Sequence, residues 1–132
     1  MKMSTRGRYA LTIMIDLAKN YENKTYMSLK EISEKEKISQ KYLERIISLL
    51  KKENFLDISR GNNGGYKLKK EPKEYKIGDI LRVTEGDLAP VNCLTSDTFC
   101  TNKSNCKTFS FWEGLYDEIN SYIDGKTLED FL

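Results

Sequence analysis

Two helix-start signals, at Ser28 and Ser39, constrain the fold of this chain most strongly. Ser28 is followed three residues later by Glu31, the capping-box spacing in which a hydroxyl and a carboxylate each satisfy a free backbone N–H. Apolar residues recur at helical spacing behind both signals, which predicts a short helix that stops near Lys37, a tight turn and a longer helix. The inward positions of the longer helix are Leu43, Ile46, Ile47 and Leu50. This is the layout of a helix-turn-helix, although an ordinary helical hairpin has a similar pattern.

The segment that follows predicts a β-hairpin. Residues 55–60 alternate in character as a strand does, residues 61–65 form a glycine-rich turn, and residues 66–70 make a lysine-rich return strand. An amphipathic helix that Ser4 or Thr5 can cap precedes the helix-turn-helix. A hairpin directly after a helix-turn-helix is a wing, so we expect a winged helix-turn-helix.

The rest of the chain predicts a fourth helix that closes before Gly86, an aperiodic segment and a long final helix from Phe109. An apolar and aromatic stripe runs along that final helix: Trp112, Leu115, Tyr116, Ile119, Tyr122 and Ile123. Such a stripe needs a partner surface, which is either its own domain or a two-fold dimer seam. We therefore expect a mainly α fold with a small β-hairpin wing and a long C-terminal dimerisation helix. Its predicted parts are a DNA-binding domain (1–86), a cysteine-containing loop (87–107) and a dimerisation helix with a C-terminal stub (108–132).

Charge is unevenly distributed along the chain. Residues 1–70 contain 16 Lys and Arg against 8 Asp and Glu, whereas residues 71–132 contain 6 against 12. This asymmetry favours a basic part that meets a polyanion. The chain has no His, which removes Ser-His-Asp and Cys-His nucleophiles, and we expect no enzyme and no catalytic residues. With no apolar run of membrane-spanning length, we expect a cytoplasmic protein with no membrane contact.

Side chains that face outward near the start of the longer predicted helix can reach base edges or phosphates: Gln40, Lys41, Tyr42, Glu44 and Arg45. Arg60, at the tip of the predicted wing, can reach an adjacent minor groove, where narrow A·T tracts concentrate negative potential. We therefore expect double-stranded DNA as the partner of the basic half.

The three cysteines, Cys93, Cys100 and Cys106, lie in one loop rich in Asn, Ser, Thr and Asp. Such a loop can gather three thiolates around one centre, so an iron–sulfur cluster, a zinc ion and a metal-free thiol switch are all open. A cluster is favoured over zinc, because zinc sites commonly use Cys-x-x-Cys pairs together with His, and this chain has neither. Either metal site is one ligand short of the usual four. A small redox enzyme that uses Cys93 and Cys106 lacks both a Cys-x-x-Cys motif and a His base.

Over essentially its whole length, the chain resembles the Rrf-type bacterial transcription regulators, which include IscR-like, NsrR-like and CymR-like members. Residues 4–11 match the family's first helix, residues 38–44 its recognition helix and residues 60–66 its wing, and the cysteine loop with the Trp112 helix matches the three-cysteine IscR-like members. The resemblance implies a homodimer with crossing C-terminal helices. It also implies major-groove and phosphate contacts from Ser39, Gln40, Lys41, Tyr42, Glu44 and Arg45, a minor-groove contact from Arg60, and cluster ligation by Cys93, Cys100 and Cys106. The cluster expected is [2Fe–2S] rather than [4Fe–4S].

Two departures from the family pattern matter: the gap between Cys93 and Cys100 is one residue longer than is usual in the IscR-like members, and the usual fourth ligand of the cluster is missing. The IscR-like members have a His where this chain has Phe109, and the NsrR-like members have a carboxylate where it has Arg8. Candidates within the loop are Asp97, Asp87, Ser104 and Thr108. The leading hypothesis is a DNA-binding repressor whose operator affinity is controlled by the cluster. The alternative is a metal-free CymR-like regulator, controlled by a partner enzyme of cysteine metabolism or by thiol oxidation.

Overall fold

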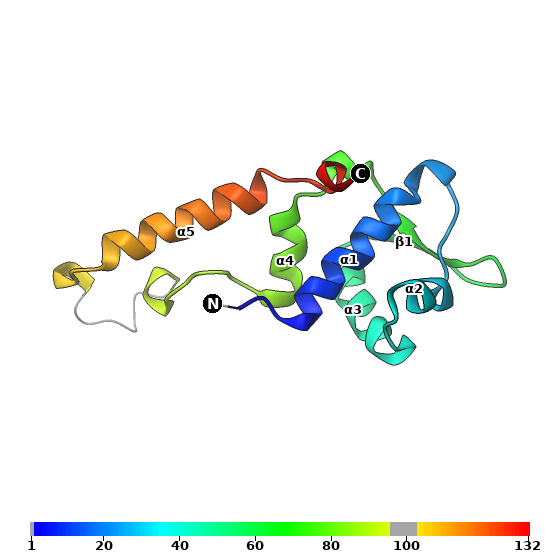
Figure 1. Cartoon of the computed structure of the whole chain (residues 1–132), viewed down its shortest axis with the longest axis horizontal. Coiled ribbons are helices and arrows are strands. Elements are labelled where there is room, and N and C mark those ends of the chain that lie inside the picture. Colours follow the sequence, from blue (N-terminus) through cyan, green and yellow to red (C-terminus); the bar gives the residue numbers. More distant parts are fainter. Residues whose placement is uncertain (1, 96–102) are drawn as a thin grey trace.

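The computed structural model describes residues 2–95 and 103–132, and within these ranges it contains five α-helices and one two-stranded antiparallel hairpin. The elements are α1 (Thr5–Lys19), α2 (Leu29–Glu36), α3 (Gln40–Lys52), β1 (Leu56–Ser59), β2 (Gly65–Leu68), α4 (Ile77–Glu85) and α5 (Phe109–Asp124). Short 3₁₀ turns lie between several of them. Figure 1 shows a winged head at one end of the molecule and α5 extending away from it. The predicted fold class is confirmed.

The predicted helix starts are confirmed by the capping contacts. Ser4 accepts a hydrogen bond from the Gly7 N–H at the start of α1. Ser28 and Glu31 form the expected capping box on α2, and Ser39 accepts from the Tyr42 N–H on α3. α2 ends where Lys37 adopts a left-handed conformation with φ 57°. This sharp turn sends the chain directly into α3, as a helix-turn-helix requires.

The core of the head is built from apolar faces of several elements. All four predicted inward residues of α3 are at most 1% exposed, and they meet buried residues of α1 and α4 such as Ile13 and Ile80. Leu128, from the end of the chain, is fully buried in the same cluster. It is held there by backbone hydrogen bonds from the Ile77 N–H to the Lys126 carbonyl and from the Leu128 N–H to the Tyr75 carbonyl. The last residues therefore complete a domain formed mostly by the first 86.

The hairpin forms the predicted wing, with Leu56 paired to Leu68 at its base and Ser59 to Gly65 near its tip. It is attached to the head by a reciprocal bridge in which the Met27 and Tyr66 N–H groups donate to each other's carbonyls at 2.9 and 2.8 Å. Gly65 is required at this bridge, because its φ is +146° and a Cβ there would overlap the Met27 backbone. The wing is thus fixed at its base.

We call residues 87–95 and 103–125 the arm, and the remaining described residues the head. The arm leaves the end of α4, runs outward, and returns to the head along α5 (Figure 1). Among the described residues no α5 side chain is buried, and Phe111 and Tyr122 are 63% and 69% exposed. No helix in the described part of the chain is both long enough and apolar enough to span a membrane.

Candidate DNA-binding surface and cysteine segment

The predicted DNA-contacting side chains of α3 are accessible at its N-terminal end. Those of Ser39, Gln40, Lys41, Glu44 and Arg45 are exposed. Tyr42 is half-buried, and its ring packs edge-on against Tyr9 with centroids 5.8 Å apart. The first turn of α3 contains a cation and no carboxylate, so the positive end of the helix dipole remains available to an anion such as a phosphate.

The negative charge of Glu44, on α3, acts on a side chain of the wing. Burial raises the pKa of the Tyr66 phenol on β2, and the negative charge of Glu44 raises it further. The Glu44 side chain itself is exposed to solvent.

Arg60 directly follows β1 and is exposed at the start of the wing turn. A groove between the helix-turn-helix and the wing is lined by Ser28, Lys51, Arg60 and Tyr66. Both cations on this groove belong to the basic half of the chain, so it suits a negatively charged backbone. The structure thus places the α3 front and Arg60 on elements that are fixed to one another, although their contacts with DNA remain predictions.

Two of the three predicted cysteine ligands are described. Cys93 lies half-buried in a short 3₁₀ turn (Asn92–Leu94), and Cys106 is exposed just before α5. The Cys106 Sγ lies 3.6 Å from the Thr108 Oγ1, and hydrogen bonding from Thr108 lowers the pKa of the Cys106 thiol. Cys100 and the candidate fourth ligand Asp97 lie outside the described residues. Metals and oxidants both react with the thiolate form of cysteine, which a lowered thiol pKa favours.

Of the other loop candidates for a fourth ligand, Ser104 is exposed, and Asp87 and Thr108 already have partners. The Asp87 carboxylate accepts a hydrogen bond from the Tyr116 hydroxyl at 2.8 Å. Thr108 accepts one from the Trp112 indole N–H at 3.2 Å. In residues 2–95 and 103–132, no group of three or more His, Cys, Asp or Glu side chains could hold a metal ion. The described donors, two cysteine thiols, fit iron–sulfur chemistry in type, and a cluster bound here would need further ligands from elsewhere.

The predicted stripe on α5 is divided between two faces of the helix. Tyr116 bonds to Asp87, while Ile119 and Ile123 line a small cavity with Met3 and Leu88. Phe111 and Tyr122 project into solvent instead. The inward face thus contacts the chain's own head and the segment that follows α4, and the outward face has no cover among the described residues.

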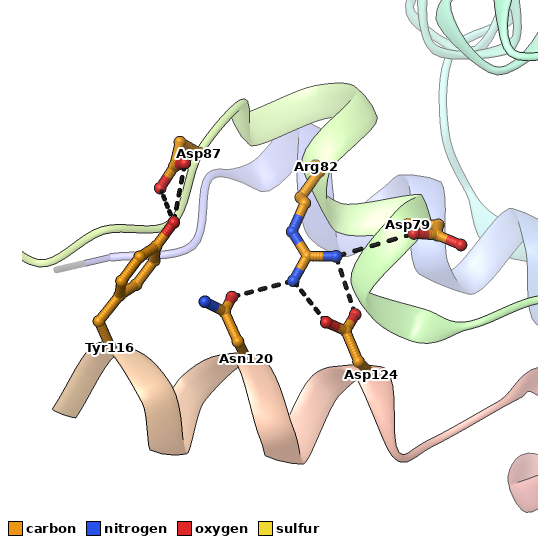
Figure 2. Close-up of polar contacts among 6 residues, drawn as sticks. All are labelled: Asp79, Arg82, Asp87, Tyr116, Asn120 and Asp124. Carbon is orange, nitrogen blue, oxygen red and sulfur yellow. Dashed lines mark hydrogen bonds and ion pairs between the residues drawn. The ribbon is translucent and has the colours of Figure 1, made fainter. Parts of the chain in front are cut away.

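A polar cluster that the sequence analysis did not identify joins α4 to α5 (Figure 2). The Arg82 guanidinium donates to both carboxylate oxygens of Asp124, at 2.8 and 2.9 Å, and to the Asn120 side-chain oxygen at 2.9 Å. Arg82 also lies 3.7 Å from Asp79. Helical spacing could not reveal these contacts, because Arg82 and Asp124 are 42 residues apart.

Comparison with known proteins gives one family match over nearly the whole chain. The Rrf2 model, described as an iron-dependent transcriptional regulator, matches residues 3–132. The HTH-type transcriptional regulator CymR of Bacillus subtilis is 40% identical over 131 residues, which are 98% of this chain and 88% of that protein. The regulator IscR of Aliivibrio salmonicida is 32% identical over 132 residues, covering 100% and 77% respectively.

The solved structure of B. subtilis CymR, titled the global cysteine regulator of that organism, has the same fold. It superposes with a TM-score of 0.82 at 37% sequence identity, over 99% of this chain and 95% of the other. The likeness spans the head and the arm together.

Proposed function

The chain belongs to the Rrf2 family of transcriptional regulators, and we propose that it is a homodimeric, cytoplasmic repressor that binds an operator in double-stranded DNA under the control of its cysteine segment. The observation that carries the DNA-binding part is the exposed, capped front of α3 beside a cationic wing. On this proposal Ser39, Gln40, Lys41, Tyr42, Glu44 and Arg45 contact the major groove and phosphates, and Arg60 enters the minor groove.

The outward face of α5 supports the dimer. Phe111 and Tyr122 are the most exposed large apolar side chains of the described chain, and Leu115 lies on the same side of the helix. Two aromatic rings left in solvent on one face are typical of a surface that a second copy covers. We therefore propose that the seam centres on this face, flanked by Trp112 and Ile119, with Tyr116 and Ile123 holding the arm to its own head.

Control through an iron–sulfur cluster is supported by three cysteines in one segment and by the lowered pKa of the Cys106 thiol. Cys93, Cys100 and Cys106 would hold the cluster, and a [2Fe–2S] centre suits the small ligand set. When bound, it would supply a redox-labile crosslink within the segment. The conformation of the arm would then differ between protein with the cluster and protein without it. The two forms would bind the operator with different affinities.

The test is anaerobic purification followed by visible absorption and iron and sulfide counting. We expect a coloured protein with equal iron and sulfide, and loss of both from Cys93→Ala and Cys106→Ala proteins. Ser110→Ala, an exposed change beside the same segment, is the matched control and should retain the cluster. A Cys106→Ala protein that assembles a normal cluster would contradict the ligand assignment.

A metal-free, CymR-like mode is the second candidate, favoured by the similarity to B. subtilis CymR and by the exposed Cys106. On this alternative, thiol oxidation or a partner enzyme of cysteine metabolism sets the operator affinity. A colourless protein that binds its operator, and whose binding responds to peroxide only while Cys106 is present, would favour it. Operator binding that requires iron, and that changes in the Cys106→Ala protein together with loss of the cluster, would exclude it.

A further inference from the structure

We infer that Arg82 is a positioning residue that fixes the angle between the head and α5, and that this angle sets the half-site spacing which the dimer accepts. The inference rests on the proposed function and adds a determinant of specificity that contacts no DNA. In a dimer joined through α5, each head meets the operator at an angle set by its own head–arm junction. The contacts at that junction therefore decide how far apart the two reading helices lie.

The geometry at the junction is that of a clamp. Arg82 projects from α4 toward the last turns of α5, where it holds Asp124 through two parallel hydrogen bonds and Asn120 through a third (Figure 2). A planar guanidinium bound in this bidentate way fixes orientation as well as distance, which a single contact cannot do. We call Arg82, Asn120 and Asp124 the clamp.

The clamp is closely fitted to the α4 backbone. A Cβ on Gly78 would overlap the Asp124 carboxylate and would lie 2.8 Å from the Arg82 Nη1. Gly78 therefore leaves the space in which the carboxylate meets the guanidinium. Ala favours helix over Gly by about 1 kcal/mol, so packing and not helix propensity explains a glycine inside α4.

Apolar packing of α5 against the head is limited. No α5 side chain is fully buried among the described residues, and Ile123 is only partly buried where it packs against the core of the head. Tyr116 provides a second tie through its hydrogen bond to Asp87, eight residues before Asp124 on the same helix. The contact with Arg82 lowers the pKa of the Asp124 carboxyl, so the clamp remains ionised at neutral pH.

The length of α5 turns a small rotation into a large displacement. Its 16 residues correspond to a helix of roughly 24 Å at ~1.5 Å per residue. A tilt of about 8° at the clamp therefore moves the far end of α5 by ~3.4 Å, the rise of one base pair. Losing the clamp should thus cost the dimer its discrimination between operators that differ by one base pair in spacing.

The experiment compares Arg82→Gln, Gly78→Ala and wild type on DNA. An operator selected from a random library by the wild-type protein is rebuilt with its half-sites one base pair closer or further apart. We expect wild type to prefer its own spacing at least tenfold, and both variants to discriminate less than threefold. Lys73→Gln removes one exposed cation of the head that pairs with Glu71 and with no clamp residue, and it should retain the wild-type ratio. Gly78→Ala keeps every charge. A loss of spacing discrimination that both variants share therefore cannot come from weaker electrostatic attraction to DNA.

Small-angle scattering of the same purified proteins separates this inference from the proposed function. If they are folded and dimeric, the Arg82→Gln and Gly78→Ala proteins should give a broader distribution of interatomic distances than wild type. Unchanged scattering or an unchanged spacing ratio in both variants would overturn the positioning role. A third outcome is that the wild-type protein enriches no DNA sequence but the scattering of the variants is still broader than that of wild type. The clamp then fixes the arm, but the inference about half-site spacing fails together with the proposed function.

Discussion

Replacing Tyr75 by Phe removes one hydroxyl at the base of the wing. Tyr75 is 3% exposed, and its hydroxyl donates to the Phe55 carbonyl at 2.7 Å while accepting from the Lys69 and Lys70 N–H groups at 3.0 and 3.2 Å. Phe55 directly precedes β1 and Lys69 directly follows β2, so the two lie next to each other at the base of the hairpin. A single oxygen therefore joins the entrance and the exit of the hairpin.

The expected cost follows from these contacts. A hydrogen bond contributes about 0.5–1.5 kcal/mol net, and the Phe ring keeps the apolar packing of the Tyr ring. The Lys69 N–H retains a longer bond to the Phe55 carbonyl at 3.4 Å, and the site is only partly buried, so water can reach the groups left behind. We therefore expect Tyr75→Phe to lower the free energy of unfolding by about 2 kcal/mol. In a chain of this length that corresponds to a Tm lower by roughly 6–10 °C.

Urea unfolding followed by far-ultraviolet circular dichroism measures this loss, and amide hydrogen exchange locates it. Exchange at Lys69 and Lys70 should accelerate at least tenfold. Tyr26→Phe is the matched control, because the Tyr26 hydroxyl makes one long bond of 3.3 Å to Asp57 on the same wing. It should cost less than about 0.5 kcal/mol. If Tyr75→Phe is as stable as Tyr26→Phe, the hydroxyl does not hold the wing and the reasoning fails.

Three further predictions concern the reading surface, the core and the clamp. Lys41→Ala and Arg60→Ala should each weaken operator binding by about 1–3 kcal/mol if they contact bases, and titrations at several salt concentrations should show affinity falling steeply with salt; salt-independent binding would contradict a DNA interface. Leu128→Ala should lower the free energy of unfolding by about 2–5 kcal/mol in urea titrations, because a fully buried side chain leaves a cavity; a cost near zero would place Leu128 outside the core. Arg82 lowers the pKa of Asp124 below 3.8, so the clamp's contribution is fully present above pH 3.8 and is lost as the pH falls through the lowered value. The stability gap between wild type and Asp124→Asn in urea should accordingly close in acid, and a gap that stays constant would argue against the ion pair.

Local chemistry was sufficient to predict most of the head. Ser28 and Ser39 sit at helix starts because a hydroxyl next to free N–H groups favours one conformation whatever the rest of the chain does. The apolar spacing of α3 likewise identified its buried face correctly. The glycine-rich turn predicted the wing, since Gly61 and Gly65 adopt positive φ values that other residues avoid.

Contacts between distant elements could not be predicted in the same way. Arg82 and Asp124 each look like an ordinary surface charge in the sequence, and only the packing of α4 against α5 makes them partners. The stripe on α5 was expected to serve one surface, whereas its member Ile123 packs toward the head and its member Tyr122 is exposed to solvent. Spacing predicts which residues share a helix face, but the neighbours of that face depend on the tertiary arrangement.

The burial of Leu128 in the head has a consequence for biosynthesis. Domains generally fold as units while the ribosome extends the chain from its N-terminus. Here the hydrophobic core of the head is incomplete until residues 126–128 have been translated, and the whole arm is translated before them. A nascent chain that stalls within the cysteine segment would therefore yield an unstable head exposed to proteolysis. On the proposed function, this instability prevents the accumulation of fragments that would bind DNA without the complete cysteine segment.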